Sequence, residues 1–321
     1  MINTRARFLS SVAGGLAGVA MPSVVRSQTA TSIRMAGVFS DLFAEPFYAD
    51  AAGAFSKRGF HVDAISLNNA GAVAAAIGGG SLEMGCGDLI SGVNAIIAGV
   101  PIVLVAGGGL YRQPMDAPAN ILAVAADSSI QSPKDLIGKS IGVPTLVGLT
   151  TVCLRSWLPA HGVPLASVKL VEIPPPTAAP ALQRGTLDAA LLSEPFVTID
   201  KGTIRSVGHP FDAAADHAVH KQFCVSVWYA SKTWIEQDRA RAVNAIAAIN
   251  ETAQWANTHH AETLAILLKN GKLDGDKVAG MLRVAFATSL TPDIIQPVFD
   301  IANQEKVFSR PVDAKSLITR V

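Results

Sequence analysis

Cysteine, charged and aromatic residues are scarce in this chain, and the first two of these shortages exclude certain classes of protein. It has only three cysteines, Cys86, Cys153 and Cys224, and their odd number and wide spacing fit neither a disulfide framework nor a zinc site. We expect three buried small hydrophobic residues, although one pair could still bridge. Charged residues make up only 16% of the chain and the formal net charge is +1, so there is no basic footprint for nucleic acid. Aromatic residues are few (6%), but half of the 321 residues are hydrophobic, which is enough for one large or two medium domains.

Common catalytic motifs are also missing. The sequence contains no GxxxxGK[ST], HExxH, GxSxG or CxxC pattern. The glycine run 107–109 is followed by Leu110-Tyr-Arg-Gln-Pro114, which does not continue into a helix and so argues against a dinucleotide loop. Asp212, Asp216, His217 and His220 are close in sequence; a solvated surface turn is favoured over a metal site. We therefore expect no catalytic residue, no metal and no cofactor.

The N-terminus has the layout of a secretory signal peptide. Arg5 and Arg7 precede an apolar stretch over 8–25, and candidate cleavage sites follow at Val25-x-Ser27 and Gly18-x-Ala20. A membrane anchor is the alternative, but the glycines and Pro22 make a poor span. Residues 4–9 resemble a twin-arginine signal in which Ala6 separates the arginines, so the export route stays open. We predict a signal peptide over 1–27 and a periplasmic location.

An internal repeat is the most informative feature. The segment Ala76-Ile-Gly-Gly-Gly80-Ser-Leu-Glu83-Met-Gly85 matches Ala181-Leu-Gln-Arg-Gly185-Thr-Leu-Asp188-Ala-Ala190 at chemically similar positions. Each segment is typical of a helix end, a glycine C-cap and a short buried strand. Chance is the alternative, because this pattern is common in α/β proteins.

The order of predicted elements extends this repeat. The first half predicts strands over 32–38, 60–67 and 82–86 with helices over 45–58 and 70–79. The second predicts strands over 140–143, 168–173 and 187–191 with helices over 149–161 and 177–184. Alternating strands and helices indicate parallel βαβ units, so we predict an α/β fold of two similar lobes with mostly parallel sheets and a ligand cleft between them.

The chain then divides into lobe 1 (31–119), lobe 2 (120–222) and a return to lobe 1 with C-terminal helices (223–321). Segments 120–125 and 223–230 are the expected crossings between the lobes. Asp238 is expected to cap a helix over 239–258, Gly271 to end a helix over 261–269, and Thr291-Pro292 to open one over 293–305.

Candidate binding residues follow from the rule that ligands bind beyond the carboxyl ends of parallel strands. That rule selects the loops 39–44, 68–71, 87–91, 144–151, 174–177 and 193–196. Within them we predict that the following residues contact a ligand: Phe39, Ser40, Asp41, Phe43, Asn68, Asn69, Asp88, Thr145, Gly148, Thr150, Thr151 and Glu194.

Several of these residues have a second interpretation. Asp88 could instead cap the helix from Leu89. The amides and hydroxyls of 145–151 suit a carboxylate, sulfonate or phosphate oxygen, but the hydroxyls could simply cap the helix. Glu194 could accept from a ligand or bind across the hinge.

Several segments resemble a known family. They are Ala49–Gly59–Val62, Ala75–Gly80–Leu82, Gly99-Val100-Pro101, the run 132–143 containing Asp135-Leu-Ile-Gly-Lys139, and 185–190 with Glu194-Pro195. These segments are similar to the sulfonate/nitrate/taurine and thiamine-precursor group of ABC-importer binding proteins. The resemblance implies a type II periplasmic binding fold, with the loops at 39–43, 68–70, 87–88, 145–151 and Glu194 touching a solute.

The resemblance predicts a non-enzymatic, monomeric receptor. It would bind a small organic anion (a sulfonate or carboxylate, aromatic or not) by lobe closure and present it to the permease of an ABC importer. The alternative is a thiamine-pyrimidine-related binding protein or enzyme on the same fold. Such an enzyme needs clustered His and Cys residues, whereas His61, His161 and His209 are dispersed and lie outside the six loops.

Overall fold

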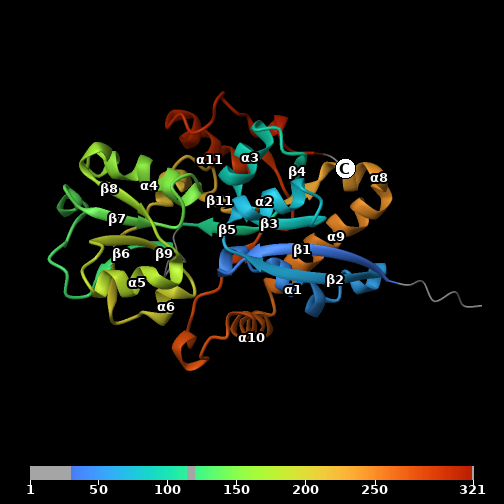
Figure 1. The fold of residues 1–321 in the computed structure, drawn as a ribbon, viewed down its shortest axis with the longest axis horizontal. Helices are drawn as coiled ribbons and strands as arrows, with labels where there is room; N and C mark the ends of the chain where they lie inside the picture. The colour runs from blue at the N-terminus through green and yellow to red at the C-terminus, as the bar shows by residue number, and fades with distance from the viewer. Residues whose placement is uncertain (1–29, 114–119, 320–321) are drawn as a thin grey trace, which may run out of the picture.

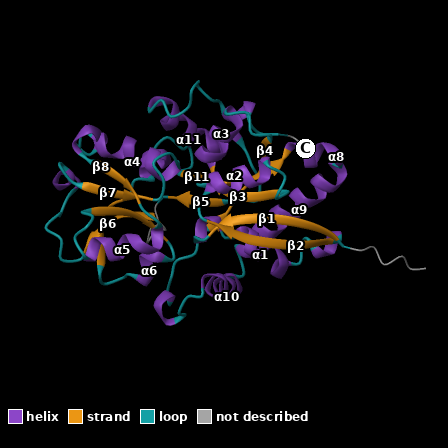
Figure 2. Cartoon of the chain, viewed as in Figure 1, coloured by secondary structure: helices purple, strands orange, loops and turns teal. Residues whose placement is uncertain are grey.

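The computed structural model describes residues 30–113 and 120–319. The predicted signal peptide, residues 1–27, lies outside the described residues. Two five-stranded sheets lie side by side, each with helices on both faces (Figures 1 and 2). No helix in the described ranges combines the length and apolarity needed to cross a bilayer.

The two sheets repeat one topology. Lobe 1 has the strand order β2 (Phe60–Leu67), β1 (Thr31–Val38), β3 (Met84–Asp88), β12 (Ser226–Ser231), β4 (Ile102–Gly107). Lobe 2 has the order β10 (Ile204–Gly208), β6 (Asn120–Ala125), β9 (Ala189–Ser193), β7 (Ser140–Val143), β8 (Lys169–Glu172). In each sheet the first three strands of the repeat are parallel, and an antiparallel strand, β12 or β6, pairs with the third. The predicted α/β class with mostly parallel sheets is confirmed.

Helices cover both faces of these sheets. In chain order they are α1 (Glu45–Ala52), α2 (Ala70–Gly78), α3 (Leu89–Ile97), α4 (Leu149–Ala160), α5 (Pro175–Gln183), α6 (Phe196–Ile199), α7 (Asp212–Ala215), α8 (Lys232–Gln237), α9 (Arg239–Ala256), α10 (His260–Gly271) and α11 (Pro292–Gln304). Side chains alternate along each strand, so β12 sends Trp228 to the side of α9 and Val227 and Tyr229 to the side of α2 and α3.

A third, small sheet joins the lobes. It pairs β11 (Gln222–Cys224), β5 (Gly109–Arg112) and β13 (Ala285–Phe286). Above it α11 packs against α3 of lobe 1 and against α4 and α7 on the side of lobe 2. The C-terminal third therefore touches both lobes.

The two copies of the internal repeat make the same backbone contacts in both lobes. Gly80 and Gly185 adopt left-handed φ values of 77° and 68°, which glycine tolerates best. Three residues later the acids make equivalent contacts: Glu83 accepts from the amide of Arg34 at 2.7 Å, and Asp188 accepts from the amide of Ser140 at 2.8 Å. These bonds tie the turn to the first strand of each lobe, and the third strands begin after them, at Met84 and Ala189 rather than at the predicted Leu82 and Leu187.

Two predicted helix boundaries are wrong. The helix expected over 45–58 stops at Gly53, whose φ is 68°, and a separate 3₁₀ turn covers Ser56–Arg58. The helix expected over 261–269 runs from His260 to Gly271, and Lys272, with φ 51°, is its C-cap, so Gly271 is its last residue rather than the residue after it. Gly271 serves close packing instead, because a Cβ there would lie 2.0 Å from the ring of Phe39.

Most other boundaries agree with the sequence. Asp238 accepts from the amide of Arg241 and caps α9 as predicted. Pro292 occupies the first turn of α11, although the Thr291 side chain makes no capping bond. The three cysteines are free and buried, as expected.

Candidate functional site

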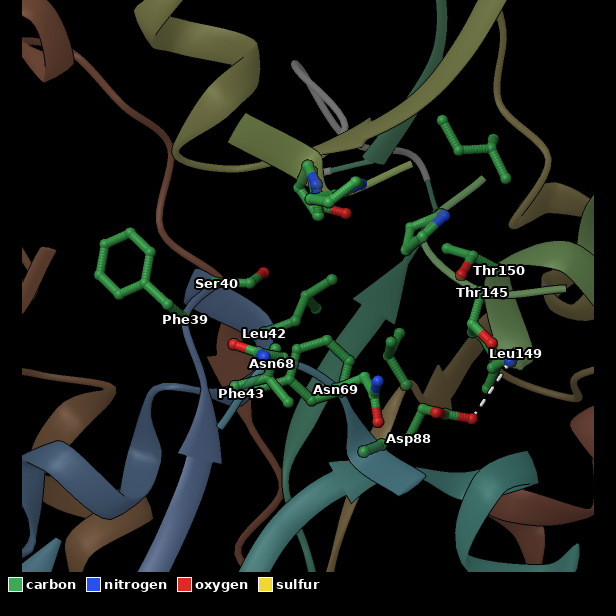
Figure 3. Close-up of a pocket in the computed structure, with 18 of the residues that line it drawn as sticks. Phe39, Ser40, Leu42, Phe43, Asn68, Asn69, Asp88, Thr145, Leu149 and Thr150 are labelled. Atoms are coloured by element: carbon green, nitrogen blue, oxygen red, sulfur yellow. Dashed lines mark hydrogen bonds between the residues drawn. The ribbon is translucent and has the colours of Figure 1, made fainter. Parts of the chain in front are cut away.

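A cavity of about 450 Å³ lies where the carboxyl ends of the strands of both lobes meet. This volume suits a small organic molecule. Its lining comes from all six predicted loops, from neighbouring positions on β2, β8 and β9, and from Phe211 and Val225 (Figure 3). The strand-end rule therefore located the cavity correctly.

Eight of the twelve predicted site residues line this cavity. They are Phe39, Ser40, Phe43, Asn68, Asn69, Asp88, Thr145 and Thr150. Asp41, Gly148, Thr151 and Glu194 do not line it. Contact with a solute remains a prediction for the eight.

The floor of the cavity on the lobe 1 side is polar. Asn69 caps α2 by accepting from the amide of Ala72 at 2.9 Å, which leaves its amide NH₂ available. Asn68 and Asn69 are both exposed (Figure 3). Together they offer donors and acceptors to a molecule in the cavity.

Asp88 connects the two lobes. It caps α3 by accepting from the amide of Ser91 at 2.9 Å, as the alternative interpretation predicted. The same Oδ1 also accepts from the amide of Leu149 at the start of α4 in lobe 2, at 3.1 Å (Figure 3). Asp88 is 7% exposed. Burial raises the pKa of its carboxyl, and the hydrogen bonds from Ser91 and Leu149 oppose that rise.

Aromatic and proline side chains form the apolar part of the lining. Phe39 of lobe 1 meets Phe196 of lobe 2 edge to face, with ring centroids 6.4 Å apart. Pro174, Pro175 and Pro176, at the start of α5 in lobe 2, also line the cavity. Apolar walls from both lobes thus face the space between them.

The threonines of the loop before α4 divide into two roles. Thr145 and Thr150 line the cavity. Thr151 is fully buried and donates its hydroxyl to the Thr145 carbonyl at 2.5 Å, so it shapes the loop. Gly148 is buried as the N-cap of α4.

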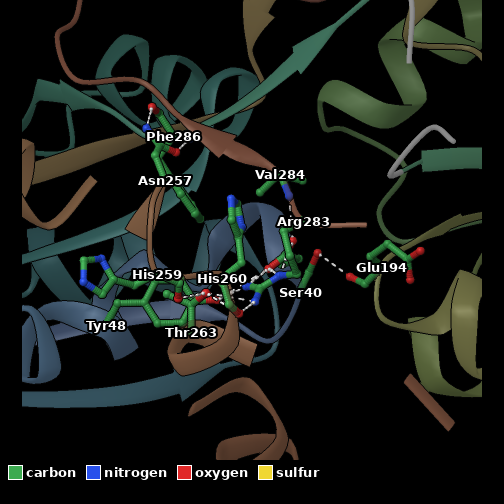
Figure 4. A network of polar contacts seen from close by, with 11 residues as sticks. Ser40, Tyr48, Glu194, Asn257, His259, His260, Thr263, Arg283, Val284 and Phe286 are labelled. Carbon is green, nitrogen blue, oxygen red and sulfur yellow. Dashed lines mark hydrogen bonds and ion pairs between the residues drawn. The ribbon is translucent and has the colours of Figure 1, made fainter. Parts of the chain in front are cut away.

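Glu194 turns away from the cavity. Its carboxylate accepts from the hydroxyl and amide of Thr198, within the first turn of α6, at 2.8 and 3.1 Å. Burial raises its pKa, while the Thr198 hydrogen bonds oppose the rise. Its backbone carbonyl instead receives the Asp41 amide at 3.1 Å and the Ser40 hydroxyl at 3.2 Å from lobe 1 (Figure 4). Of the two interpretations offered for Glu194, the contact between lobes is the one observed, through its main chain.

Asp41 lies in an internal ion pair rather than at the cavity. Its carboxylate contacts Arg283, and it also accepts from the amide of Val284 at 2.9 Å (Figure 4). Tyr48 and Thr263 complete the arrangement by bonding to the same guanidinium. Burial lowers the pKa of Arg283, but the charges and hydrogen bonds of Asp41 and Tyr48 together more than offset this, and the net direction of the pKa shift is upward.

Some lining residues were not among the predicted site residues. They include Leu42, Ser66, Leu67, Leu149, Glu172, Ser193 and Phe196. Ser66 and Glu172 stand at or next to strand ends, so extending the predicted loops back by two residues would have found them, whereas Ser193 lies inside the predicted loop 193–196 but was not among the predicted site residues. Val225 lies in the segment 223–230 that was expected to cross between the lobes, although it was not a predicted site residue, and no sequence signal indicated Phe211.

The residues that could bind a metal or act as a nucleophile have other surroundings in this structure. Among residues 30–113 and 120–319, no cluster of three His, Cys, Asp or Glu side chains could hold a metal ion. Asp212 accepts from the hydroxyl of Tyr111, and Asp216 pairs with Lys221. Burial raises the pKa of the thiol of Cys224 to about 12, which keeps it protonated.

Comparison with known proteins gives the family. A family model described as NMT1/THI5 like matches residues 42–263, which is more than half of the chain. The chain belongs to the NMT1/THI5-like family.

One curated protein similar to this chain is the taurine-binding periplasmic protein of Escherichia coli (strain K12). It is 31% identical over 152 residues, a match that spans 46% of this chain and 44% of the relative. The chain therefore aligns with less than half the length of that protein.

Solved structures confirm the type II periplasmic binding protein fold. The periplasmic aliphatic sulphonate binding protein SsuA from Escherichia coli superposes with a TM-score of 0.71 at 18% identity, over 90% of this chain and 97% of that one. The alkanesulfonate-binding protein SsuA from Xanthomonas axonopodis pv. citri, bound to MOPS, gives 0.72 at 15%, over 91% and 99%. The periplasmic nitrate-binding protein NrtA from Synechocystis PCC 6803 gives 0.67 at 13%, over 89% and 84%.

Proposed function

We propose that this protein is the extracytoplasmic solute receptor of an ABC importer, binding one small organic molecule between its lobes. The observation that carries this proposal is the cavity itself, which both lobes line with their strand ends, together with two sets of hydrogen bonds that join the lobes. These are the Asp88–Leu149 bond and the bonds from Ser40 and Asp41 to Glu194.

Contacts between lobes of this kind favour a closing mechanism. They exist only when the lobes approach, so a solute that touches both lobes shifts the equilibrium toward the closed state. The closed surface then presents both lobes to a permease. Relatives named as sulfonate-, taurine- and nitrate-binding proteins support this role.

The sequence favours an anionic solute, and the names of the relatives agree with that preference. The charge of the side chains that line the cavity bears on this question directly. The role as a solute receptor does not depend on the sign of the solute's charge.

A binding function without turnover is the second part of the proposal. The described lining contains no Cys, His or Lys side chain, whereas a pyrimidine-forming enzyme of this fold would need reactive His and Cys residues near the substrate. Incubating a bound solute with the protein and recovering it unchanged by mass spectrometry would support a receptor. A chemically altered product would favour the enzyme.

Export through residues 1–27 is the third part. Relatives described as periplasmic support it. Expression of the full chain in a Gram-negative host, followed by fractionation and N-terminal sequencing, tests the location and the cleavage site together.

The central experiment is a binding screen by calorimetry on residues 28–321, combined with small-angle scattering. A receptor should bind at least one small organic molecule at micromolar or lower Kd and contract on binding. A folded protein that binds no member of a panel of amines, alcohols, carboxylates and sulfonates, and carries no co-purified molecule, would contradict the proposal.

A further inference from the structure

The cavity has an unbalanced charge. Its described lining contains two carboxylates, Asp88 and Glu172, and no Lys, Arg or His side chain. Of the two acids, Asp88 is the buried one, at 7% exposure, whereas Glu172 lies exposed near the rim and accepts from the amide of Leu146. A buried anion is costly unless it is paired, so a bound molecule of negative charge would meet repulsion here.

The helix N-termini around the cavity do not reverse this balance. An anion normally gains from free amides at such termini. Here the Asn69 side chain accepts a hydrogen bond from the amide of Ala72 in α2. The Asp88 carboxylate accepts hydrogen bonds from the amides of Ser91 in α3 and Leu149 in α4.

Two more helices, α5 and α6, begin beside the cavity. α5 begins with Pro175 and Pro176, which have no amide hydrogen to offer. In α6 the Glu194 carboxylate takes the amide of Thr198. The predicted oxyanion site at 145–151 therefore lacks the Leu149 amide, because a protein carboxylate already holds it.

Asp88 is also placed to meet a cation. The amides of Ser91 and Leu149 both bond to Oδ1, and the Ser91 side chain and the Ile90 amide also favour the ionised carboxylate. Figure 3 shows the carboxylate between Asn69 of lobe 1 and Leu149 of lobe 2, at the level where the lobes meet. A positive group there would pair with Asp88 in a water-poor setting, where charge-assisted hydrogen bonds are strong.

The rest of the lining suits an apolar body. Phe39, Phe43 and Phe196 contribute aromatic surface, and Pro174–Pro176 of lobe 2 add a stiff apolar surface. Aromatic faces also attract cations.

We propose that the solute is an organic cation, an amine or amidine on an aromatic or otherwise apolar body, with its N–H groups bound to Asp88. This inference rests on the proposed receptor function and specifies its ligand class. It separates this chain from relatives whose names refer to sulfonate, taurine or nitrate.

A matched set of probes tests the charge directly. Phenethylamine, 2-phenylethanol and phenylacetate share one body and carry a cation, a neutral hydroxyl and an anion. Calorimetry on the full mature chain should rank them amine, alcohol, carboxylate, with the amine bound at least about tenfold more tightly than the carboxylate. Tighter binding of the alcohol or of the carboxylate would overturn the inference.

Variants assign the effect to Asp88. Asp88→Asn keeps an oxygen acceptor for the Ser91 and Leu149 amides but removes the charge, so it should weaken phenethylamine about tenfold and strengthen phenylacetate. Glu172→Gln, at the exposed rim, should change amine binding less than about threefold. Asp127→Asn removes the same charge from an exposed turn of lobe 2 far from the lining and should leave binding unchanged.

The outcomes separate the two levels of the proposal. If phenylacetate or taurine binds and contracts the protein while phenethylamine does not, the receptor function stands and the cationic ligand class is wrong. Amine binding that Asp88→Asn leaves intact also refutes the class. If no probe binds and mass spectrometry of the purified, folded chain finds no small molecule, the receptor function itself fails. An identified co-purified cation supports the inference, and a co-purified anion overturns it.

Discussion

Arg283 and Asp41 form an ion pair inside the protein, with Nη2 and Oδ1 2.5 Å apart and with side chains only 7% and 0% exposed. The two residues are 242 positions apart in the chain. Asp41 belongs to the 3₁₀ turn 41–43 that follows β1, and the neighbouring Ser40 reaches the other lobe. The pair thus anchors the loop that carries the contact between lobes.

Arg283→Ala should destabilise the fold strongly, because it leaves the Asp41 carboxylate buried without its partner. We expect a loss of about 3–5 kcal/mol in the free energy of unfolding, measured by urea denaturation. Arg58→Ala is the matched control, since Arg58 pairs with Glu251 at the surface and its loss should cost about 1 kcal/mol or less. Equal losses of unfolding free energy for the two substitutions would mean that the buried ion pair stabilises the fold no more than the surface pair does.

Ser40→Ala should favour the open state. It removes the hydroxyl bond to the Glu194 carbonyl but leaves the Asp41 amide bond in place. A net hydrogen bond of about 0.5–1.5 kcal/mol corresponds to solute binding roughly 2- to 12-fold weaker. Small-angle scattering of the unliganded protein should show a larger radius of gyration.

The control for this substitution is Ser56→Ala, whose hydroxyl bonds to Gly53 within lobe 1. It should match the wild type in both measurements. A wild-type scattering profile for Ser40→Ala would show that the bond does not influence closure.

Glu45→Gln should change how stability depends on pH. Glu45 is fully buried, and burial raises its pKa well above the usual value of about 4.5, while its bond from Trp228 opposes the rise. Because the folded state then holds a proton that the unfolded state releases, the wild type loses stability as pH rises from about 4.5 toward the folded-state pKa. The variant lacks this titration.

Denaturation at several pH values separates this effect from a packing change. Placing an amide in this pocket adds a cost that is the same at every pH. The difference in unfolding free energy should therefore move in favour of Glu45→Gln as pH rises from 4.5. A difference that stays constant would show that Glu45 has the same pKa folded and unfolded.

Gly92→Ala should overpack the site beside Asp88. An added Cβ would lie 2.3 Å from Cε1 of Tyr229, whose hydroxyl donates to the Asp88 carbonyl. We expect a loss of about 1–3 kcal/mol in thermal or urea unfolding. Gly275→Ala, where the nearest atom to the new Cβ is 3.8 Å away, should stay within about 0.5 kcal/mol of the wild type. If both variants unfold alike, Tyr229 can move aside freely.

The sequence predicted local features well, because they depend on neighbouring residues. Asp238 and Asp88 cap their helices through amides three residues on, and β1 and β2 follow from their apolar patterns and flanking glycines. The strand-end rule located the cavity because it depends only on the direction of parallel strands.

Side-chain direction and long-range pairing could not be predicted in this way. Asp41 and Phe43 are two residues apart in one turn, yet one pairs internally and the other lines the cavity. Nothing near Asp41 in sequence indicates Arg283. Likewise, the use of the Leu149 amide by Asp88 depends on how closely the lobes approach.

The repeated lobes differ where they meet the cavity. The ties from Glu83 to Arg34 and from Asp188 to Ser140 are equivalent, but after the second strand lobe 1 has Asn68-Asn69 and lobe 2 has three prolines. At this position of the repeat, lobe 1 presents polar amide side chains and lobe 2 a stiff apolar surface. A molecule held between them meets a different chemistry at each end, so the two halves together dictate its polarity: it enters in one orientation, and a symmetrical compound gains from only one of its ends.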